Sequence, residues 1–329
     1  MLKNNLGQPQ ATHVLLSELA QSIFSTSAPL PIERMQEGVS TEVYRICHAG
    51  EVFYLRILPE VEASFAPEVY VHTLLQACGA HVPKVVYFEH LHPVLQRSVM
   101  ITTEIPGHAI GHGAHDYDVR PIIRAAGQEL AGVNAIAVAG FGWVLRDQPS
   151  VDRLQAEYAT YEEWVQKHVA ESFAVLGQRN VLSATDVATV GLVMAEATKL
   201  FGDEPSVLAH GDFDVTHIYQ HSGQYTGLID FGEIRGANRF YDLGHFQVEN
   251  AELLPDLLAG YTEISPLPSD AMRRILAMSV LIAVRRLGRR IARSGDIYGP
   301  DLAAIARALR AWQPVGAVVT PTAIYSFPK

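Results

Sequence analysis

Residues 210–233 constrain the fold of this chain more than any other part of its sequence. Near the start of this segment lies Asp212, and near its end lies Asp230. Between them, residues 218–220 and 225–229 have the apolar and β-branched character of two short strands, separated by turn-forming residues. A tight hairpin would bring the chain back on itself, so we expect Asp212 and Asp230 to face one pocket.

Two carboxylates held close together repel each other unless a cation or a proton lies between them. This pattern favours a hard divalent ion, and Mg²⁺ with the phosphates of a nucleotide fits it best. In phosphoryl transfer by kinases, one Asp orients the attacking hydroxyl, while a nearby residue and a second Asp hold the metal. Asp212, His217 and Asp230 follow one another in that order. We therefore predict Asp212 as the catalytic base, and Asp230 with His217 as metal ligands.

Three short motifs carry a family resemblance: His210-Gly211-Asp212, Ile229-Asp230-Phe231-Gly232-Glu233 and Tyr241-Asp242-Leu243. Together they resemble the catalytic core of the aminoglycoside phosphotransferase and protein kinase-like families, over about residues 35–245. The family usually has Asn where His217 stands, and magnesium prefers oxygen donors, so His217 is the one clear departure.

The resemblance implies an α+β, protein kinase-like fold with two lobes. Residues 1–105 would form a nucleotide-binding lobe with an antiparallel sheet and one main helix. Residues 106–329 would form a mostly helical lobe that carries the catalytic and substrate-binding groups. The expected strands of the first lobe lie near residues 32–35, 43–46, 52–58, 82–88 and 98–105.

A turn at residues 36–41 connects the first two expected strands. In a kinase-like lobe this turn would lie over the nucleotide phosphates, with backbone N–H groups at Gly38 and the hydroxyls of Ser40 and Thr41 as donors. It lacks the Gly-Lys-Ser/Thr of a phosphate-binding Walker loop. A plain hairpin turn is the alternative interpretation of these residues.

Arg56 is a lone cation in an apolar strand, and a buried charge needs a partner. Glu68, in the first turn of the following predicted helix, is the natural counter-ion. The resemblance implies that Arg56 contacts the α- and β-phosphates and that Glu68 holds it in place. It also places the hinge between the lobes at Glu104 and Ile105, whose backbone groups would pair with the nucleobase. Both ATP and GTP remain open as donors.

Several residues near the catalytic motif are given supporting roles. His210 is expected to orient the loop by hydrogen bonding, and Asp242 is expected to brace the loop from behind. Asp214 is a competing candidate for the base, but an Asp in a loop often caps backbone N–H groups instead. Asn134 stands where relatives often have His, and we assign it no role.

Helical periodicity predicts further helices at residues 11–24, 119–136, 151–176, 185–200, 251–261, 270–293 and 301–312. The helix at 270–293 carries seven arginines: Arg273, Arg274, Arg285, Arg286, Arg289, Arg290 and Arg293. They form either a solvated stripe or a docking surface for an anionic substrate or partner. The second alternative would count against an aminoglycoside as the acceptor.

Composition excludes several classes of protein. The formal net charge of −10 argues against general nucleic-acid binding, which needs clustered Lys and Arg. The two cysteines are too few for a disulfide framework. No signal peptide or apolar run of transmembrane length is evident, so we expect a cytoplasmic protein that does not bind membranes.

The sequence therefore predicts an enzyme that transfers the γ-phosphoryl group of ATP or GTP to a hydroxyl of a small molecule, such as an aminoglycoside-like antibiotic or a metabolite. The alternative is a nucleotide-binding regulatory pseudokinase, because the altered residue at His217 could cripple transfer. A third hypothesis is a metallohydrolase that uses His210, Asp212, His217 and Asp230. The acceptor and the oligomeric state stay open.

Overall fold

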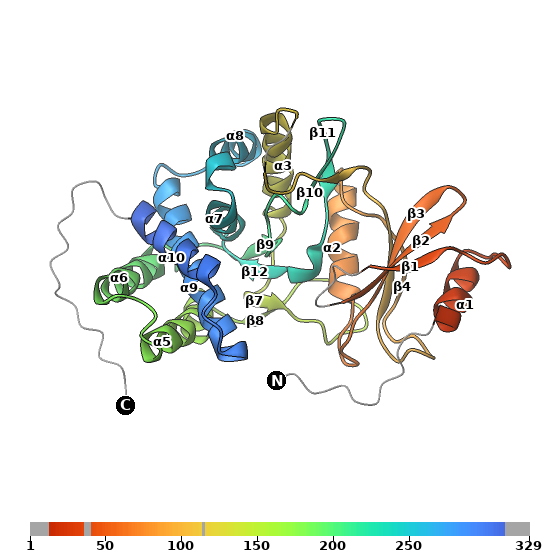
Figure 1. Cartoon of the computed structure of the whole chain (residues 1–329), viewed down its shortest axis with the longest axis horizontal. Helices are drawn as coiled ribbons and strands as arrows, with labels where there is room; N and C mark the ends of the chain where they lie inside the picture. Colours follow the sequence, from red (N-terminus) through yellow and green to blue (C-terminus); the bar gives the residue numbers. More distant parts are fainter. Residues whose placement is uncertain (1–12, 36–40, 114–115, 313–329) are drawn as a thin grey trace. The chain divides into compact units, whose positions relative to one another are not determined.

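The computed structural model describes residues 13–35, 41–113 and 116–312 (Figure 1). Contacts divide the chain into two compact units. The first comprises Met1–Pro106, Leu145–Asp152 and Gly227–Ile229, and the second comprises Gly107–Val144, Arg153–Thr226 and Asp230–Lys329. In the described ranges, no helix is both long enough and apolar enough to cross a membrane.

The first unit is built on a five-stranded antiparallel sheet with the strand order β1-β2-β3-β5-β4. Its strands are β1 (Ile32–Arg34), β2 (Glu42–His48), β3 (Glu51–Ile57), β4 (Val85–Glu89) and β5 (Val99–Thr103), and its helices are α1 (His13–Ile23) and α2 (Ala66–Ala77). All the strands predicted for this part of the sequence are present, with ends shifted by a few residues.

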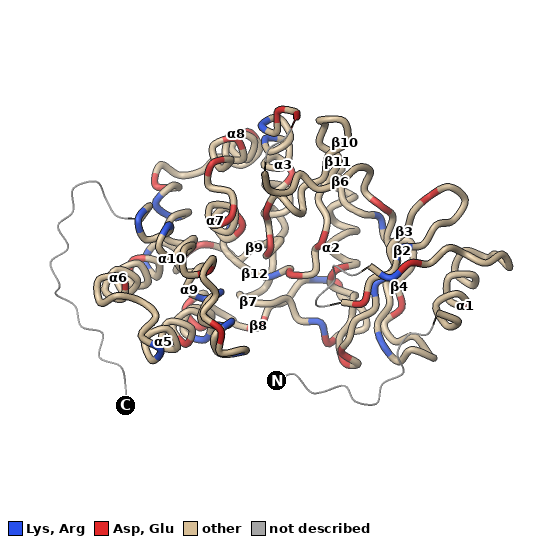
Figure 2. The backbone as a smooth tube through the Cα atoms, viewed as in Figure 1, with Lys and Arg blue, Asp and Glu red and all other residues tan. Residues whose placement is uncertain are grey.

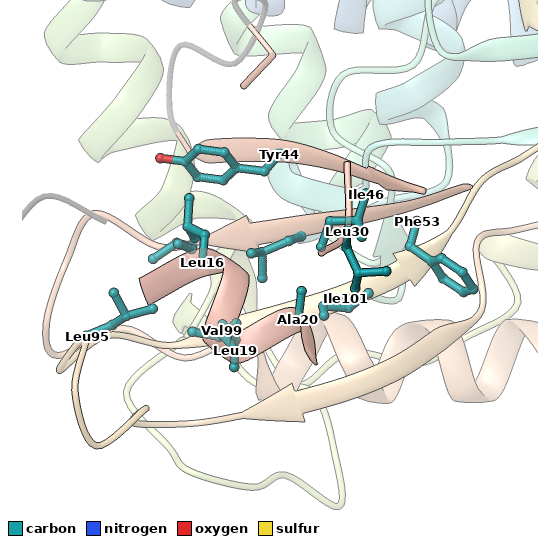
Figure 3. Close-up of a cluster of buried hydrophobic side chains, with 12 residues drawn as sticks. Leu16, Leu19, Ala20, Leu30, Tyr44, Ile46, Phe53, Leu95, Val99 and Ile101 are labelled. Atoms are coloured by element: carbon teal, nitrogen blue, oxygen red, sulfur yellow. The ribbon is translucent and has the colours of Figure 1, made fainter. Parts of the chain in front are cut away.

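Buried and more exposed residues alternate along β3, so its side chains point to opposite faces of the sheet. Phe53, Leu55 and Ile57 are buried and pack in one cluster with Leu16 and Leu19 of α1 (Figure 3). Successive side chains of a strand point to opposite faces, so Arg56 leaves this apolar cluster and faces away from α1. The pattern of the strand therefore aims a single cation at the other face of the sheet.

The second unit contains most of the helices and two smaller sheets, except for the last two residues of β11, which belong to the first unit. A three-stranded sheet has the order β11-β10-β6, and a four-stranded sheet has the order β8-β7-β12-β9. The strands are β6 (His108–Ala109), β7 (Phe141–Val144), β8 (Ala156–Tyr158), β9 (Val207–Ala209), β10 (Ile218–His221), β11 (Gln224–Leu228) and β12 (Arg235–Ala237). The α-helices are α3 (Arg120–Val133), α4 (Tyr161–Trp164), α5 (Glu171–Gln178), α6 (Ala184–Phe201), α7 (Phe240–Glu249), α8 (Leu254–Ile264), α9 (Ala271–Ser294) and α10 (Gly299–Trp312).

The predicted hairpin at the catalytic segment forms between β10 and β11. Ser222 has φ = 53° and Gly223 has φ = 75°. Positive φ at both central residues is typical of the type I′ turn, whose twist matches that of the flanking strands. The α+β architecture, with an N-terminal antiparallel sheet and a helical C-terminal part, agrees with the predicted fold class.

The single helical region predicted at residues 151–176 is wrong in its first part. Residues 156–158 form β8, which pairs with β7. The helix begins only at Tyr161, after Thr160 and Glu163 form a capping box, and Val165–Ala170 continues it as a π-helical turn. Pairing with the preceding strand, β7, overrides the local helical periodicity here.

Helices α3 and α8 approach each other through two glycines. A Cβ added to Gly127 would lie 2.1 Å from the carbonyl oxygen of Leu257, and one added to Gly260 would lie 1.8 Å from that of Arg124. Such distances are far inside van der Waals contact with backbone atoms, which cannot rotate away. The absence of a side chain at both positions therefore sets the separation of this helix pair.

We predict that Gly127→Ala destabilises the protein by about 1–3 kcal/mol, because the added methyl group forces the two helix backbones apart. Gly132→Ala, on the same helix, is the matched control, since a Cβ there meets nothing within 4 Å. That control should be neutral or stabilising by up to about 1 kcal/mol through helix propensity. Chemical denaturation measures both variants, and equal stability of the two would contradict the close approach of α3 and α8.

Candidate active site

The loop that follows β9 is held by a buried carboxylate. The backbone N–H of His210 donates to Asp242 Oδ2 at 2.8 Å, and that of Gly211 donates to Asp242 Oδ1 at 2.9 Å. Asp242 lies in the first turn of α7 and has no solvent exposure. The bracing role predicted for Asp242 is therefore confirmed in its geometry.

Asn134, for which no role was predicted, supports the same carboxylate. Its side-chain Nδ2 donates to Leu208 O at 2.9 Å and to Asp242 Oδ2 at 3.3 Å. The Tyr261 hydroxyl donates to Asn134 Oδ1 at 3.1 Å. These contacts join residues far apart in sequence, so no local pattern signalled them.

Gly211 brings the loop against the segment that follows the hairpin. Its φ is 93°, and a Cβ at this position would lie 2.0 Å from Glu233 O and 2.7 Å from Arg235 Nε. Only glycine adopts this conformation easily and leaves room for that approach. The two acidic motifs of the sequence are therefore adjacent in space.

His217 links the backbone at Asp212 to the side chain of Asp230. Its Nδ1 lies 2.7 Å from Asp212 O, and its Nε2 lies 3.9 Å from Asp230 Oδ2. A carbonyl oxygen only accepts hydrogen bonds, so Nδ1 carries a proton, and Nε2 is the ring nitrogen that faces Asp230. Asp230 has φ = 61°, and its Oδ1 accepts the N–H of Gly232 at 3.2 Å.

His210 and Asp214 hold the shape of the same loop. The ring of His210 lies against those of Phe231 and His217, with centroids 4.8 Å and 5.6 Å away, and its Nδ1 accepts the Asp212 N–H at 3.4 Å. Asp214 Oδ1 accepts the backbone N–H of Thr216 at 2.7 Å, which is the capping role that the sequence favoured.

His245 is the second residue that the sequence analysis missed. Its Nε2 lies 3.3 Å from Asp212 Oδ1, and its Nδ1 lies 3.2 Å from Phe213 O. Both neighbours are acceptors, so both ring nitrogens are protonated when Asp212 is ionised. His245 stands three residues after Asp242 on α7, and this i,i+3 spacing, which puts both side chains on one face, is the signal that could have found it.

The pairing of His245 with Asp212 shifts the pKa of each group. The hydrogen bond from His245 holds the pKa of the Asp212 carboxyl well below its usual range, against the opposing effect of burial. Burial of the His245 ring lowers its pKa, but the hydrogen bond and the charge of Asp212 outweigh burial and raise the pKa above its ordinary value. The Asp212 side chain remains 46% exposed, so an ionised oxygen is accessible to a ligand.

In the first unit, the expected ion pair between Arg56 and Glu68 is present. Glu68 is fully buried, and the guanidinium of Arg146 adds a second cation at 3.7 Å. Glu104 accepts a hydrogen bond from the Tyr54 hydroxyl at 3.1 Å, and its own N–H donates to Val52 O at 3.1 Å.

Of the predicted phosphate-loop residues, Thr41 lies half-buried just before β2. Gly38 and Ser40 lie outside the described residues.

The predicted metal ligands supply one carboxylate and one imidazole nitrogen. No group of three or more His, Cys, Asp or Glu side chains in the described ranges is arranged to hold a metal. Mg²⁺ is often held by one or two carboxylates and completed by phosphate oxygens and waters, so this pair suits an ion that arrives with a nucleotide. The imidazole nitrogen is the donor that fits magnesium least.

Comparison with known proteins identifies the family of the chain. A sequence model of the phosphotransferase enzyme family matches residues 31–275. The chain belongs to this family. A search of curated proteins found no match.

Several solved structures share the fold. The chain is similar to the aminoglycoside phosphotransferase APH(4)-Ia in a ternary complex with ADP and hygromycin B, with TM-score 0.64 and 17% identity over 92% of this chain and 99% of that one. It is also similar to a putative fructosamine-3-kinase from Thermobifida fusca, with TM-score 0.59 and 17% identity over 90% and 98% of the two chains. The macrolide 2'-phosphotransferase MphH from Brachybacterium faecium gives TM-score 0.58 and 16% identity over 91% and 98%.

The pKa shifts of the His245–Asp212 pair predict a pH dependence of stability. Because the pKa of His245 is raised in the folded state, its contribution to the free energy of unfolding is fully present below the unfolded pKa of about 6.5. That contribution is lost as the pH rises through the folded pKa. The lowered pKa of Asp212 makes its contribution complete above about pH 4. The pair therefore stabilises the fold most between these two values.

The variant His245→Gln tests this pH dependence, because its side-chain amide can donate to Asp212 but does not titrate. We expect the free energy of unfolding of the wild type to fall more than that of His245→Gln between about pH 6 and pH 9. Denaturant titration at each pH measures this difference, and other titrating groups cancel between the two proteins. Parallel curves would show that the imidazolium contributes nothing.

Proposed function

We propose that this protein transfers the γ-phosphoryl group of ATP or GTP to a hydroxyl of a small molecule, with Asp212 as the catalytic base. The observation that carries the proposal is the half-exposed, ionised carboxylate of Asp212 on a loop that Asp242 anchors, beside His217 and Asp230. Membership of the phosphotransferase enzyme family supports the same reaction class.

Asp212 would act mainly by orientation. Its lowered pKa makes it a weak proton acceptor before the reaction but keeps it ionised at neutral pH. In a loose transition state the attacking hydroxyl keeps its proton until late, so a charged acceptor that fixes the direction of attack is sufficient. Because His245 donates to Oδ1, Asp212 Oδ2 is the oxygen that would receive the substrate hydroxyl.

Asp230 and His217 would hold Mg²⁺ together with the phosphates of the nucleotide. When bound, the ion neutralises charge on the β- and γ-phosphates. The contribution of this chain is to fix the two donors: Asp230 by its left-handed backbone and its hydrogen bond from Gly232, and His217 by its hydrogen bond to Asp212 O.

In the first unit, Arg56 would contact the α- and β-phosphates while Glu68 holds its guanidinium. Backbone N–H groups at Gly38 and the hydroxyls of Ser40 and Thr41 would cover the phosphates. The Glu104 carbonyl and the Ile105 N–H would pair with the nucleobase.

The proposed lobes are residues 1–105 for nucleotide binding, and 106–329 for catalysis and acceptor binding. The named relatives act on, or are bound to, small molecules such as hygromycin B and macrolides, which supports a small-molecule acceptor. We expect the reaction to take place in the cytoplasm.

Replacing Asp212 by Asn tests the role of the base. We expect kcat to fall by roughly two to four orders of magnitude, with nucleotide binding largely kept. Coupled ADP release across a panel of hydroxyl-bearing acceptors gives the rate, and calorimetry with a non-hydrolysable ATP analogue gives the affinity. Asp214→Asn is the matched control from the same loop. A larger loss in Asp214→Asn than in Asp212→Asn would transfer the role of base to Asp214.

Replacing His217 by Asn tests the metal site. An imidazole nitrogen favours Mn²⁺ over Mg²⁺ relative to an amide oxygen, so His217→Asn should raise the ratio of Mg²⁺- to Mn²⁺-supported binding of the ATP analogue by roughly tenfold. Electron paramagnetic resonance of bound Mn²⁺ reports the metal site directly. An unchanged metal preference, with no nitrogen coupling in the wild-type spectrum, would remove His217 from the ligand set.

A regulatory pseudokinase is the second candidate, and the observation that favours it is the imidazole at position 217. It predicts a protein that binds ATP or GTP but releases no ADP with any acceptor. The acceptor panel with the wild-type protein therefore separates the two candidates.

A further inference from the structure

The arginines of α9 differ in their interaction partners. Four of them pair with carboxylates at the ends and the sides of the helix: Arg273 with Glu196, Arg274 with Asp270 and Glu204, Arg286 with Glu249 and Asp301, and Arg290 with Asp301. Among the described residues, Arg285, Arg289 and Arg293 have no carboxylate within 4.0 Å. Figure 2 shows basic residues in blue along α9 and on β12, which carries Arg235. A uniform solvated stripe does not describe this helix.

Arg285 is a buried cation without a counter-ion in the described part of the chain. Its side chain is 6% exposed, and its Nη1 donates to the Tyr241 hydroxyl at 3.1 Å. The buried Nε has no hydrogen-bond partner among the described atoms. Burial, together with the charges of Arg235 and Arg289, lowers the pKa of Arg285 to about 10, which still leaves it charged at neutral pH. A charge in this position is costly unless an anion compensates it.

Two further guanidiniums gather at the same place, around Trp143. The guanidinium of Arg235 lies over the Trp143 ring at 4.2 Å, and that of Arg289 lies at 5.8 Å. Arg235 Nη1 also donates to the Tyr241 hydroxyl, at 2.8 Å. Arg235, Arg285 and Arg289, with Trp143 and Tyr241, form what we call the arginine cluster.

The carboxylates beside the arginine cluster already have partners. Glu233 Oε2 accepts from Arg235 at 3.1 Å. Glu157 Oε2 accepts the Trp143 N–H at 3.1 Å and lies 3.6 Å from His168 Nε2. Neither carboxylate lies within ion-pair distance of Arg285 or Arg289, so the cluster keeps an excess of positive charge.

Arg235 connects the arginine cluster to the loop that carries Asp212. Arg235 Nε donates to Glu233 O at 3.2 Å, and a Cβ added at Gly211 would lie 2.7 Å from the same Nε. The Tyr241 hydroxyl accepts hydrogen bonds from Arg235 and Arg285. Tyr241 directly precedes Asp242, the residue that anchors the loop. A ligand held at the cluster would therefore lie beside the catalytic loop.

We propose that the acceptor of this phosphotransferase carries an anionic oxygen group, a carboxylate or a phosphate, that binds Arg285 and Arg289 beside Trp143. The proposal rests on the proposed function and names the chemical class of its substrate. A planar guanidinium offers paired N–H donors that match carboxylate and phosphate oxygens, and the bound anion would satisfy Arg285 Nε. A polycationic aminoglycoside would be repelled by the same groups. Because Arg285 is buried, a small ligand reaches it more easily than the flat surface of a macromolecule.

The first experiment measures anion binding without catalysis. Inorganic phosphate and, separately, acetate are titrated into the full-length protein with and without Mg²⁺ and a non-hydrolysable ATP analogue, and calorimetry and tryptophan fluorescence report binding. The two probes distinguish a phosphate site from a carboxylate site. The variants are Arg289→Ala, which alters an exposed side chain, and Arg285→Lys, which keeps the charge but loses the planar fork. Arg293→Ala, one turn further along α9, is the matched control.

We expect at least one probe to bind to the wild type and to Arg293→Ala with equal affinity. Its affinity should fall by at least about tenfold in Arg289→Ala and in Arg285→Lys. Failure of the wild type to bind either probe would overturn the proposal. So would equal affinity in the wild type and Arg289→Ala.

The second experiment compares acceptors in matched pairs, such as a sugar phosphate with its parent sugar and a hydroxy acid with its amide. We expect the anionic member of a pair to have the higher kcat/KM, and Arg289→Ala to remove the difference. Transfer to neutral acceptors that Arg289→Ala does not alter would leave the proposed function standing and overturn the anionic site. Anion binding that depends on Arg289, with no transfer to any acceptor, would overturn the proposed function and keep the site.

Discussion

The hydrogen bonds that Asp242 accepts are the interaction on which the catalytic loop depends. A carboxylate with no solvent exposure is stable only where donors surround it, and here the donors are the backbone N–H groups of His210 and Gly211 and the side-chain amide of Asn134. The negative charge therefore holds two consecutive peptide groups in one orientation. This fixes the direction in which the side chain of the next residue, Asp212, projects from the loop.

Three carboxylates of this region have different environments, and their environments suit different tasks. Asp242 is fully buried, Asp212 is half-exposed beside an imidazolium, and Asp230 is half-exposed at the end of a hairpin. The first can only organise the backbone. The second is kept ionised by His245, and the third accepts the N–H of Gly232 and lies near His217 Nε2, an arrangement that suits a ligand for a cation.

Sequence reasoning succeeded where the interaction is local or where one charge demands another. The hairpin between β10 and β11 follows from its turn residues, and the pair of Arg56 and Glu68 follows from a lone cation in an apolar strand. The α+β architecture follows from the family resemblance that the motifs at residues 210–243 carry.

Sequence reasoning failed where a contact depends on how the elements are placed in the fold. Asn134 lies 108 residues from Asp242, and its contact depends on how α3 is placed in the fold. His245 required knowing which face of α7 meets the loop. The strand β8 required knowing that β7 would lie beside it.

The arginine-rich helix shows the same limit in another form. All its cations look alike in the sequence, yet the structure gives some of them carboxylates and leaves Arg285 enclosed with only the Tyr241 hydroxyl as its hydrogen-bond partner among the described residues. What distinguishes them is the residue that each side chain meets: Arg285 meets the hydroxyl of Tyr241 on α7, whereas Arg286 meets the carboxylate of Glu249 on the same helix. Composition can therefore report the number of charges on a helix, but not which of them is left uncompensated.

The closeness of α3 and α8 has a consequence for the distant catalytic loop. Tyr261 follows Gly260 on α8, and its hydroxyl reaches Asn134 at the end of α3. The spacing between these helices thus determines whether a chain of hydrogen bonds from Tyr261 through Asn134 to Asp242 stays connected. Substitutions on the outer side of this helix pair would therefore change activity although they alter no residue that contacts a substrate.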